Sequence, residues 1–156
     1  MEKKFIVGVD FDGTITSDVN WEFNFKLRPY SLDALIGIKG LGGLIWIYSG
    51  RSNSQMRDEV LIRHGVDCYE EMVEKLQEFE IPYDKILTPE DLKYGKPICD
   101  FFVDDRSIGF KGDWKWIFEE IKKKVEDPSF ESYLDKFEFL KENRSFRKLR
   151  EVPNVR

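Results

Sequence analysis

The stretch Phe5-Ile6-Val7-Gly8-Val9-Asp10-Phe11-Asp12-Gly13-Thr14 decides the fold of this chain. Its first five residues are uncharged and four of them are apolar, which is typical of a strand buried on both faces of a parallel sheet. Because side chains alternate along a strand, Asp10 and Asp12 point the same way. Neighbouring carboxylates repel each other unless a proton or a cation separates them. The end of this strand is therefore either an ordinary Asp-Gly turn or a charged site.

The length and composition favour one folded domain. A chain of 156 residues with 41% hydrophobic residues can bury a substantial core and is not disordered. No apolar run approaches the roughly 20 residues of a membrane span, and the run before Asp10 is too short for a signal peptide. The two cysteines, Cys68 and Cys99, lack metal-type spacing and favour free thiols. We therefore expect a cytoplasmic protein without membrane contact.

Charge is distributed unevenly along the chain. Residues 135–156 hold seven Lys or Arg and four acidic residues, so that this segment carries +3 and the remainder −8 of the net −5. A basic segment either holds phosphates or nucleic acid, or forms a solvated helix face against an acidic body. The acidic body argues against a broad nucleic-acid surface, so a nucleic-acid partner is not favoured.

Short apolar runs alternate with helical stripes along the rest of the chain. Further strands are predicted at 44–48, 66–69, 85–88 and 98–103. Helices are predicted from Ser31, from the polar cluster at 52–54, over 70–80, over 114–125 and from Pro128. This alternation predicts an α/β fold with a parallel sheet and helices on both faces.

Two of these helices have a predicted inner face. Met56, Val60 and Leu61 supply it in the helix after the polar cluster, and Phe130, Tyr133, Leu134 and Phe137 supply it in the last helix. The predicted organisation is a catalytic domain over residues 1–126, with a C-terminal helical extension and basic tail over 127–156.

Three of the predicted strands end in polar clusters. These clusters are Asp10–Thr14, Ser49-Gly50-Arg51 and Asp104-Asp105. Ligands of parallel sheets bind outside the carboxyl ends of the strands, so we expect all three clusters to meet at one edge of the sheet. This convergence favours a functional site over a simple turn.

The same combination resembles the haloacid dehalogenase (HAD) superfamily, whose members are mostly Mg-dependent phosphohydrolases with a Rossmann-like sheet. The resemblance covers about residues 5–110. The D-x-D-G-T motif matches Asp10–Thr14, the strand-end serine matches Ser49, the motif lysine matches Lys96, and the acidic pair matches Asp104-Asp105. The intervals between these motifs are too short for the mobile cap domain of many relatives. The resemblance therefore implies a small capless member, in which the Trp21–Tyr30 segment is a candidate minimal lid.

The resemblance implies catalysis through an aspartyl phosphate. Asp10 is then the nucleophile, and Asp12 protonates the leaving group and later deprotonates water. Lys96 pairs with the phosphoryl oxygens and with Asp10, with Lys93 or Lys111 as alternatives.

The implied metal is Mg²⁺, which prefers carboxylate oxygens, waters and substrate phosphate as ligands. Asp10, the carbonyl of Asp12 and Asp105 are the implied ligands. Asp104 either binds the metal or orients its neighbour.

Other residues are expected to bind phosphate or to support the site. Ser49 and the backbone near Gly13 and Gly50 are expected to donate to the phosphoryl oxygens. Thr14 is expected to orient Asp12, and Arg51 either contacts substrate or forms a surface ion pair. Further residues have no catalytic role assigned: His64 is expected to be structural, and Trp21, Phe23 and Phe25 belong either to the core or to the entrance of the site.

We therefore expect a Mg-dependent phosphatase that hydrolyses phosphate monoesters, either small molecules or exposed groups on macromolecules. One alternative is a phosphotransferase with the same intermediate, and another is a catalytically weak phosphate-binding or scaffold protein. A two-component receiver domain is excluded, because its phosphoacceptor aspartate ends a middle strand, and the corresponding strand here ends in Ser49.

Overall fold

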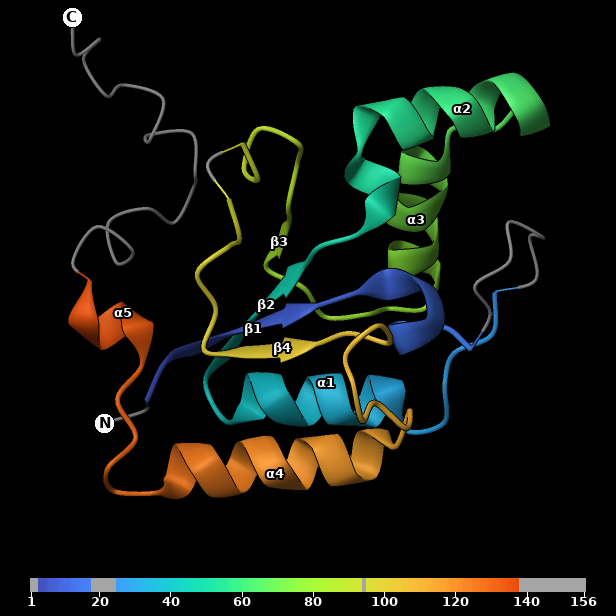
Figure 1. Ribbon diagram of the computed structural model, residues 1–156. Coiled ribbons are helices and arrows are strands. Elements are labelled where there is room, and N and C mark those ends of the chain that lie inside the picture. Colours follow the sequence, from blue (N-terminus) through green and yellow to red (C-terminus); the bar gives the residue numbers. More distant parts are fainter. Residues whose placement is uncertain (1–2, 18–24, 94, 138–156) are drawn as a thin grey trace, which may run out of the picture.

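The computed structural model describes residues 3–17, 25–93 and 95–137. Trp21, Phe23 and the basic segment 138–156 lie outside these residues. The described chain forms one sheet of parallel strands in the order β3-β2-β1-β4 (Figure 1). The strands are β1 (Phe5–Val9), β2 (Gly43–Ile47), β3 (Lys85–Ile86) and β4 (Phe101–Val103). The predicted α/β fold with a parallel, Rossmann-like sheet is confirmed.

Strand β1 is central, and every one of its residues is buried. Val9, its last residue, lies opposite Ile47 of β2 and Val103 of β4. The ladder continues for one more step, because Tyr48 N donates to Val9 O at 3.0 Å and Asp10 N donates to Val103 O at 2.9 Å. The residues that follow these three strands therefore lie side by side at one edge of the sheet.

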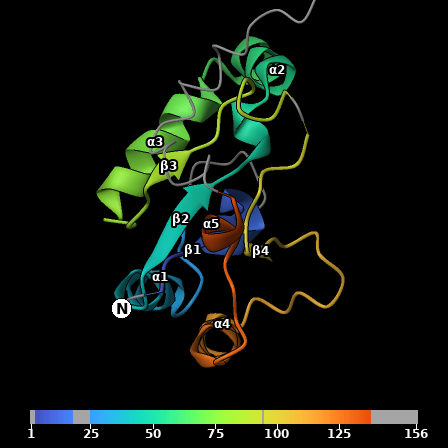
Figure 2. The same cartoon turned by 90° about the vertical axis from the view of Figure 1, so that its left-hand side faces the viewer.

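The described residues also form five helices. They are α1 (Ser31–Gly40), α2 (Ser54–His64), α3 (Cys68–Glu78), α4 (Trp114–Glu126) and α5 (Tyr133–Lys136). Two short turns, η1 (Phe11–Ile15) and η2 (Gly50–Ser52), follow β1 and β2. Helices α1 and α4 lie next to each other against one face of the sheet (Figures 1 and 2). Among the described residues, no helix is long and apolar enough to cross a membrane.

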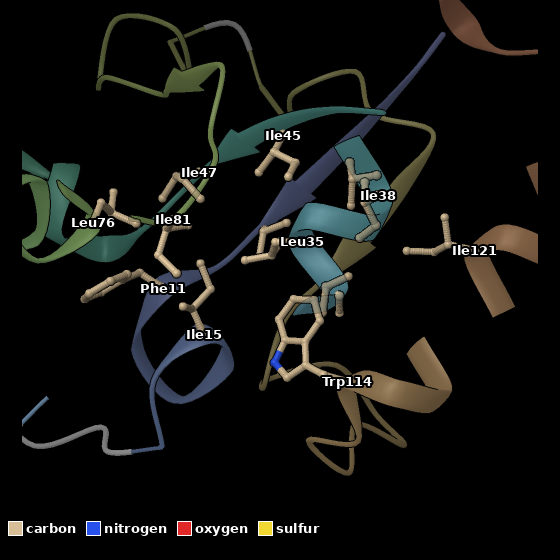
Figure 3. Close-up of a cluster of buried hydrophobic side chains, with 14 of the residues drawn as sticks. Phe11, Ile15, Leu35, Ile38, Ile45, Ile47, Leu76, Ile81, Trp114 and Ile121 are labelled. Atoms are coloured by element: carbon tan, nitrogen blue, oxygen red, sulfur yellow. The ribbon is translucent and has the colours of Figure 1, made fainter. Parts of the chain in front are cut away.

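The main core lies between the sheet and these helices (Figure 3). It joins side chains of β1 and β2 to Leu35 and Ile38 of α1, Leu76 of α3, and Trp114 and Ile121 of α4. Phe11 and Ile15 of η1 belong to the same cluster, so the turn after β1 is fixed by core packing. Burial of each large apolar side chain contributes roughly 1.5–3 kcal/mol to stability.

A smaller core covers the other face of the sheet, where Ile6 and Trp46 pack against Leu134 of α5. Asp100 joins α5 to the sheet, because its carboxylate accepts from Ile6 N at 2.7 Å, Ser132 Oγ at 2.8 Å and Tyr133 N at 2.8 Å. The segment from Ser132 to Lys136 is thus attached to this face of the sheet by both packing and hydrogen bonds.

The predicted strand at 66–69 is wrong. Cys68 is the first residue of α3, and the side chain of Asp67 caps this helix by accepting from the backbone N–H groups of Tyr69 and Glu70. An aspartate cap satisfies N–H groups that have no partner within the helix, which favours a helix start at this point.

Two predicted helix faces also need correction. In α2, Val60 is buried, whereas Met56 and Leu61 are 41% and 49% exposed. The last helix begins at Tyr133 with Ser132 as its cap, because Asp127 and Ser129 form a hydrogen-bonded turn where the helix was predicted to start. Of the four residues predicted to face inward, two do so: Leu134 is buried and Phe130 packs on the main core. The other two, Tyr133 and Phe137, stack on each other at the surface.

Candidate functional site

The turn that follows β1 has a backbone shape that the sequence demands. Asp10 and Asp12 are extended, and Gly13 has φ 72°, in the left-handed region that favours glycine. A Cβ atom at Gly13 would lie 2.6 Å from Oδ2 of Asp105, so this position also has no room for a side chain. The missing side chain brings the turn close to the acidic pair after β4.

Three carboxylates from two strand ends meet at this point. Asp10, Asp104 and Asp105, hereafter the acidic cluster, each offer one oxygen, and these oxygens lie within 4.8 Å of one another. All three side chains are partly exposed, so the cluster opens to solvent at the carboxyl edge of the sheet. The predicted convergence of the first and fourth motifs is therefore present in the fold.

The environment of Asp10 disfavours its ionised form. Burial, a hydrogen bond with Asp105 and the negative charges of Asp104 and Asp105 raise the pKa of Asp10 from its ordinary 3.8 to about 8. A cation between these carboxylates removes this penalty, because its positive charge favours ionisation of all three.

The acidic cluster has the donor set of a hard divalent cation. Mg²⁺ binds through one or two carboxylates and keeps the rest of its octahedral sites for water or phosphate, which suits a partly open group of oxygens. The lack of a side chain at Gly13 lets Asp105 lie close to the turn after β1. The residues present therefore fit a magnesium site.

Thr14 joins the two sides of the cluster, and this corrects its predicted role. Its hydroxyl accepts from the backbone N–H of Asp105 at 2.9 Å and lies 3.3 Å from Oδ2 of Asp10. Sequence reasoning expected Thr14 to orient Asp12, but the hydroxyl orients the nucleophile candidate and the acidic pair instead.

Asp12 and Arg51 form a buried ion pair beside the cluster. Nε and Nη2 of Arg51 donate to the two oxygens of Asp12 at 2.7 and 2.8 Å. The Arg51 side chain is 1% exposed, and it also contacts Glu71 at 3.3 Å and the carbonyl of Cys68 at 3.2 Å. The rings of Phe11 and Phe25 lie 5.6 and 5.1 Å from its guanidinium carbon. Of the two roles predicted for Arg51, the structure shows an ion pair, and it is buried.

Lys96 is not placed against the acidic cluster. Its Nζ lies 4.0 Å from the ring centroid of Phe102, and no ion pair joins it to the cluster in the described part of the chain. The predicted interaction with Asp10 is therefore not formed in this structure. Of the alternatives, Lys111 is exposed in the segment before α4 and Lys93 is exposed in the loop before Lys96.

Ser49 lies at the predicted position, directly after β2 and next to the ends of β1 and β4. It is 7% exposed, and its Oγ accepts from Arg51 N at 3.2 Å, which caps η2. Gly50 is the first residue of η2. The Ser49-Gly50-Arg51 motif thus forms a turn that places the Arg51 side chain against Asp12.

Sequence reasoning missed three residues that support the site. Tyr48 donates to Oδ2 of Asp104 at 2.8 Å, Arg28 Nε donates to Gly13 O at 2.7 Å, and Trp114 Nε1 donates to Thr14 O at 2.8 Å. Burial and the hydrogen bond to Asp104 raise the pKa of Tyr48, so its hydroxyl stays protonated and remains a donor. A local signal existed only for Tyr48, which directly precedes Ser49 at a strand end.

Comparison with known proteins supports the fold. No protein-family profile matches the chain, and no curated protein matches it. Among solved structures, a conserved protein from Bacteroides thetaiotaomicron is similar with a TM-score of 0.59 and 21% identity, covering 86% of this chain and 98% of that chain. A target protein from Vibrio cholerae has 26% identity and a TM-score of 0.39, covering 76% and 98%. The first of these similarities shows the shared α/β fold.

Proposed function

We propose that this protein is a Mg²⁺-dependent phosphatase of the HAD type that hydrolyses phosphate monoesters through an aspartyl phosphate on Asp10. The observation that carries the proposal is the acidic cluster. Its carboxylates lie within 4.8 Å of one another at the edge of a parallel sheet where ligands bind. Neighbouring acids at such an edge favour a bound cation and an anionic substrate over a purely structural role.

Asp10 is the candidate nucleophile because it follows the central strand and is held from two sides. Its backbone N–H donates to the carbonyl of Val103, and Thr14 contacts its Oδ2. A carboxylate in a fixed position can attack phosphorus and form an acyl phosphate, which water then hydrolyses.

Asp12 is the candidate general acid and base, and Arg51 fixes its direction. Arg51 occupies one acceptor site on each oxygen of Asp12, so each oxygen keeps a second site at which it can hold a proton. The ion pair therefore orients Asp12 without blocking proton transfer. Lys96 is the candidate phosphate partner, and its side chain is exposed.

The acidic cluster would hold Mg²⁺, which when bound neutralises phosphoryl oxygens and orients the phosphate for attack. Because all three side chains of the cluster are partly exposed, a substrate whose phosphate is accessible is favoured. A phosphotransferase, with an acceptor other than water, needs the same residues and remains the second candidate. A phosphate-binding scaffold is less favoured, since it has no need for three adjacent carboxylates.

The test is hydrolysis of p-nitrophenyl phosphate with Mg²⁺, followed by a panel of phosphorylated sugars, nucleotides and nucleic-acid ends. We expect EDTA to abolish turnover and Asp10→Asn to reduce it to the background rate, since an amide is a poor nucleophile. The matched control is Asp113→Asn, which makes the same change at the exposed cap of α4 and should keep full activity because asparagine also caps helices. Turnover that survives Asp10→Asn or EDTA would contradict the proposal.

A further inference from the structure

Tyr48 lies between the ends of three strands without belonging to any motif that the sequence suggested. It follows the last residue of β2, and its backbone N–H continues the ladder by donating to Val9 O at 3.0 Å. Its side chain crosses to the end of β4, where the hydroxyl donates to Oδ2 of Asp104 at 2.8 Å. One residue thus connects the second strand to the acidic pair that follows the fourth.

This hydrogen bond completes the orientation of the Asp104 carboxylate. The other oxygen, Oδ1, accepts from the backbone N–H of Arg106 at 2.8 Å. A carboxylate oxygen accepts about two hydrogen bonds or metal bonds, so each oxygen of Asp104 keeps one free acceptor site. With both oxygens fixed, Asp104 cannot rotate away from the cluster without losing a hydrogen bond.

The ring of Tyr48 is itself held in place. It packs edge-on against Phe102, with centroids 5.8 Å apart and an interplanar angle of 77°. Nζ of Lys96 lies over the same Phe102 ring at 4.0 Å from its centroid. Packing therefore fixes the ring, and the hydroxyl contributes one specific contact, which a change to phenylalanine removes without emptying the space.

We propose that Tyr48 is a positioning residue for a divalent cation, acting through Asp104. In this role Asp104 is a ligand whose free acceptor site is directed at the ion by the Tyr48 hydroxyl. This inference rests on the proposed function, which assigns the acidic cluster as the Mg²⁺ site. Partners that orient a ligand in this way typically change metal affinity or activity by 10–100-fold when they are removed.

The experiment measures Mg²⁺ binding directly by isothermal titration calorimetry, with no substrate present. We compare the wild type with Tyr48→Phe and with Tyr133→Phe, which removes a hydroxyl from an exposed ring at a distance from the cluster. The expected result is a dissociation constant about tenfold higher for Tyr48→Phe and unchanged for Tyr133→Phe. In EDTA, all three proteins should melt at closely similar temperatures, because the ring packing is retained.

The hydrolysis rate gives a second readout. For Tyr48→Phe, we expect the Mg²⁺ concentration for half-maximal rate to rise with the dissociation constant, while the rate at saturating Mg²⁺ returns to that of the wild type. An unchanged dissociation constant, or a wild type that binds no Mg²⁺, would overturn the role of Tyr48. A tenfold change in binding without phosphatase activity in either protein would support Tyr48 and refute the proposed reaction, so the two failures are distinguishable.

Discussion

Arg51 and Asp12, 39 positions apart in the sequence, share two parallel hydrogen bonds of 2.7 and 2.8 Å, with Arg51 buried and Asp12 partly buried. Two-point pairing of this kind is specific to the planar guanidinium and is stronger than a contact between single charges. It connects the turn after β1 to the turn after β2, and through Glu71 it also reaches α3.

The first prediction concerns this pair. Arg51→Ala leaves Asp12 and Glu71 without their buried partner, so we expect the free energy of unfolding in urea to fall by about 3 kcal/mol. The control is Arg63→Ala, which removes an exposed arginine paired with Glu59 on α2 and should cost less than about 0.5 kcal/mol. A loss below about 1 kcal/mol for Arg51→Ala would show that the pair does not stabilise the fold.

The second prediction follows from the pKa of Asp10. In the metal-free protein this pKa is raised from 3.8 to about 8, so between these values the folded state binds a proton that the unfolded state has lost. Stability contributed by this group is therefore full below about pH 4 and is lost as the pH rises toward 8. In EDTA at pH 8, Asp10→Asn should melt at least about 3 °C above the wild type, the shift that ~1 kcal/mol gives a domain of this size.

At pH 3 the same two proteins should melt at nearly equal temperatures, because Asp10 is then largely neutral in both the folded and the unfolded wild type. A gap between them that is equal at both pH values would point to a packing effect of the substitution and not to the charge.

The third prediction links the same group to the metal. Mg²⁺ binds the ionised form of Asp10, so below pH 8 it must displace a proton. We expect the affinity to fall about tenfold for each pH unit between 8 and 6, and the heat of binding at pH 7 to depend on the ionisation enthalpy of the buffer. Titration in phosphate-free buffers of different ionisation enthalpy measures both. An affinity independent of pH would exclude Asp10 as a titrating ligand.

The fourth prediction separates backbone strain from crowding at Gly13. Gly13 and Gly65 have nearly the same φ, 72° and 69°, but a Cβ at Gly65 meets no atom within 4 Å, whereas at Gly13 it meets Asp105. Gly65→Ala should therefore lower stability by about 1 kcal/mol and leave Mg²⁺ binding intact. Gly13→Ala should lose stability and also weaken Mg²⁺ binding, as measured by calorimetry. Equal metal affinity in both variants would mean that Asp105 moves aside without effect.

The sequence predicted the sheet and its polar edge because both depend on local patterns. A run of apolar residues such as Phe5–Val9 predicts a buried strand from its composition alone. Parallel strands bring their carboxyl ends to one edge of the sheet, whatever segments connect them. The meeting of Asp10 with Asp104 and Asp105 therefore follows from these patterns alone.

The supporting contacts could not be predicted, because they depend on tertiary packing. Nothing near Arg28 or Glu71 in the sequence signals a contact with Gly13 or Arg51. The helix predicted from Pro128 was wrong for a related reason. Asp127 forms a local turn with Ser129. The helix begins instead at Tyr133, whose N–H donates to Asp100, about 30 residues earlier in the chain. Such competition between a local turn and a distant acceptor leaves no pattern in the sequence.

The hydrogen bond from Trp114 to the carbonyl of Thr14 has a consequence for protein synthesis. Asp12 and the whole acidic cluster lie before residue 106, yet the turn that carries Thr14 is held by the first residue of α4. During translation, a chain that has reached residue 113 contains every one of these carboxylates but lacks this partner, together with the core contacts of Trp114. A growing chain therefore gains this contact to the turn only once Trp114 has left the ribosome, after all of the carboxylates of the site.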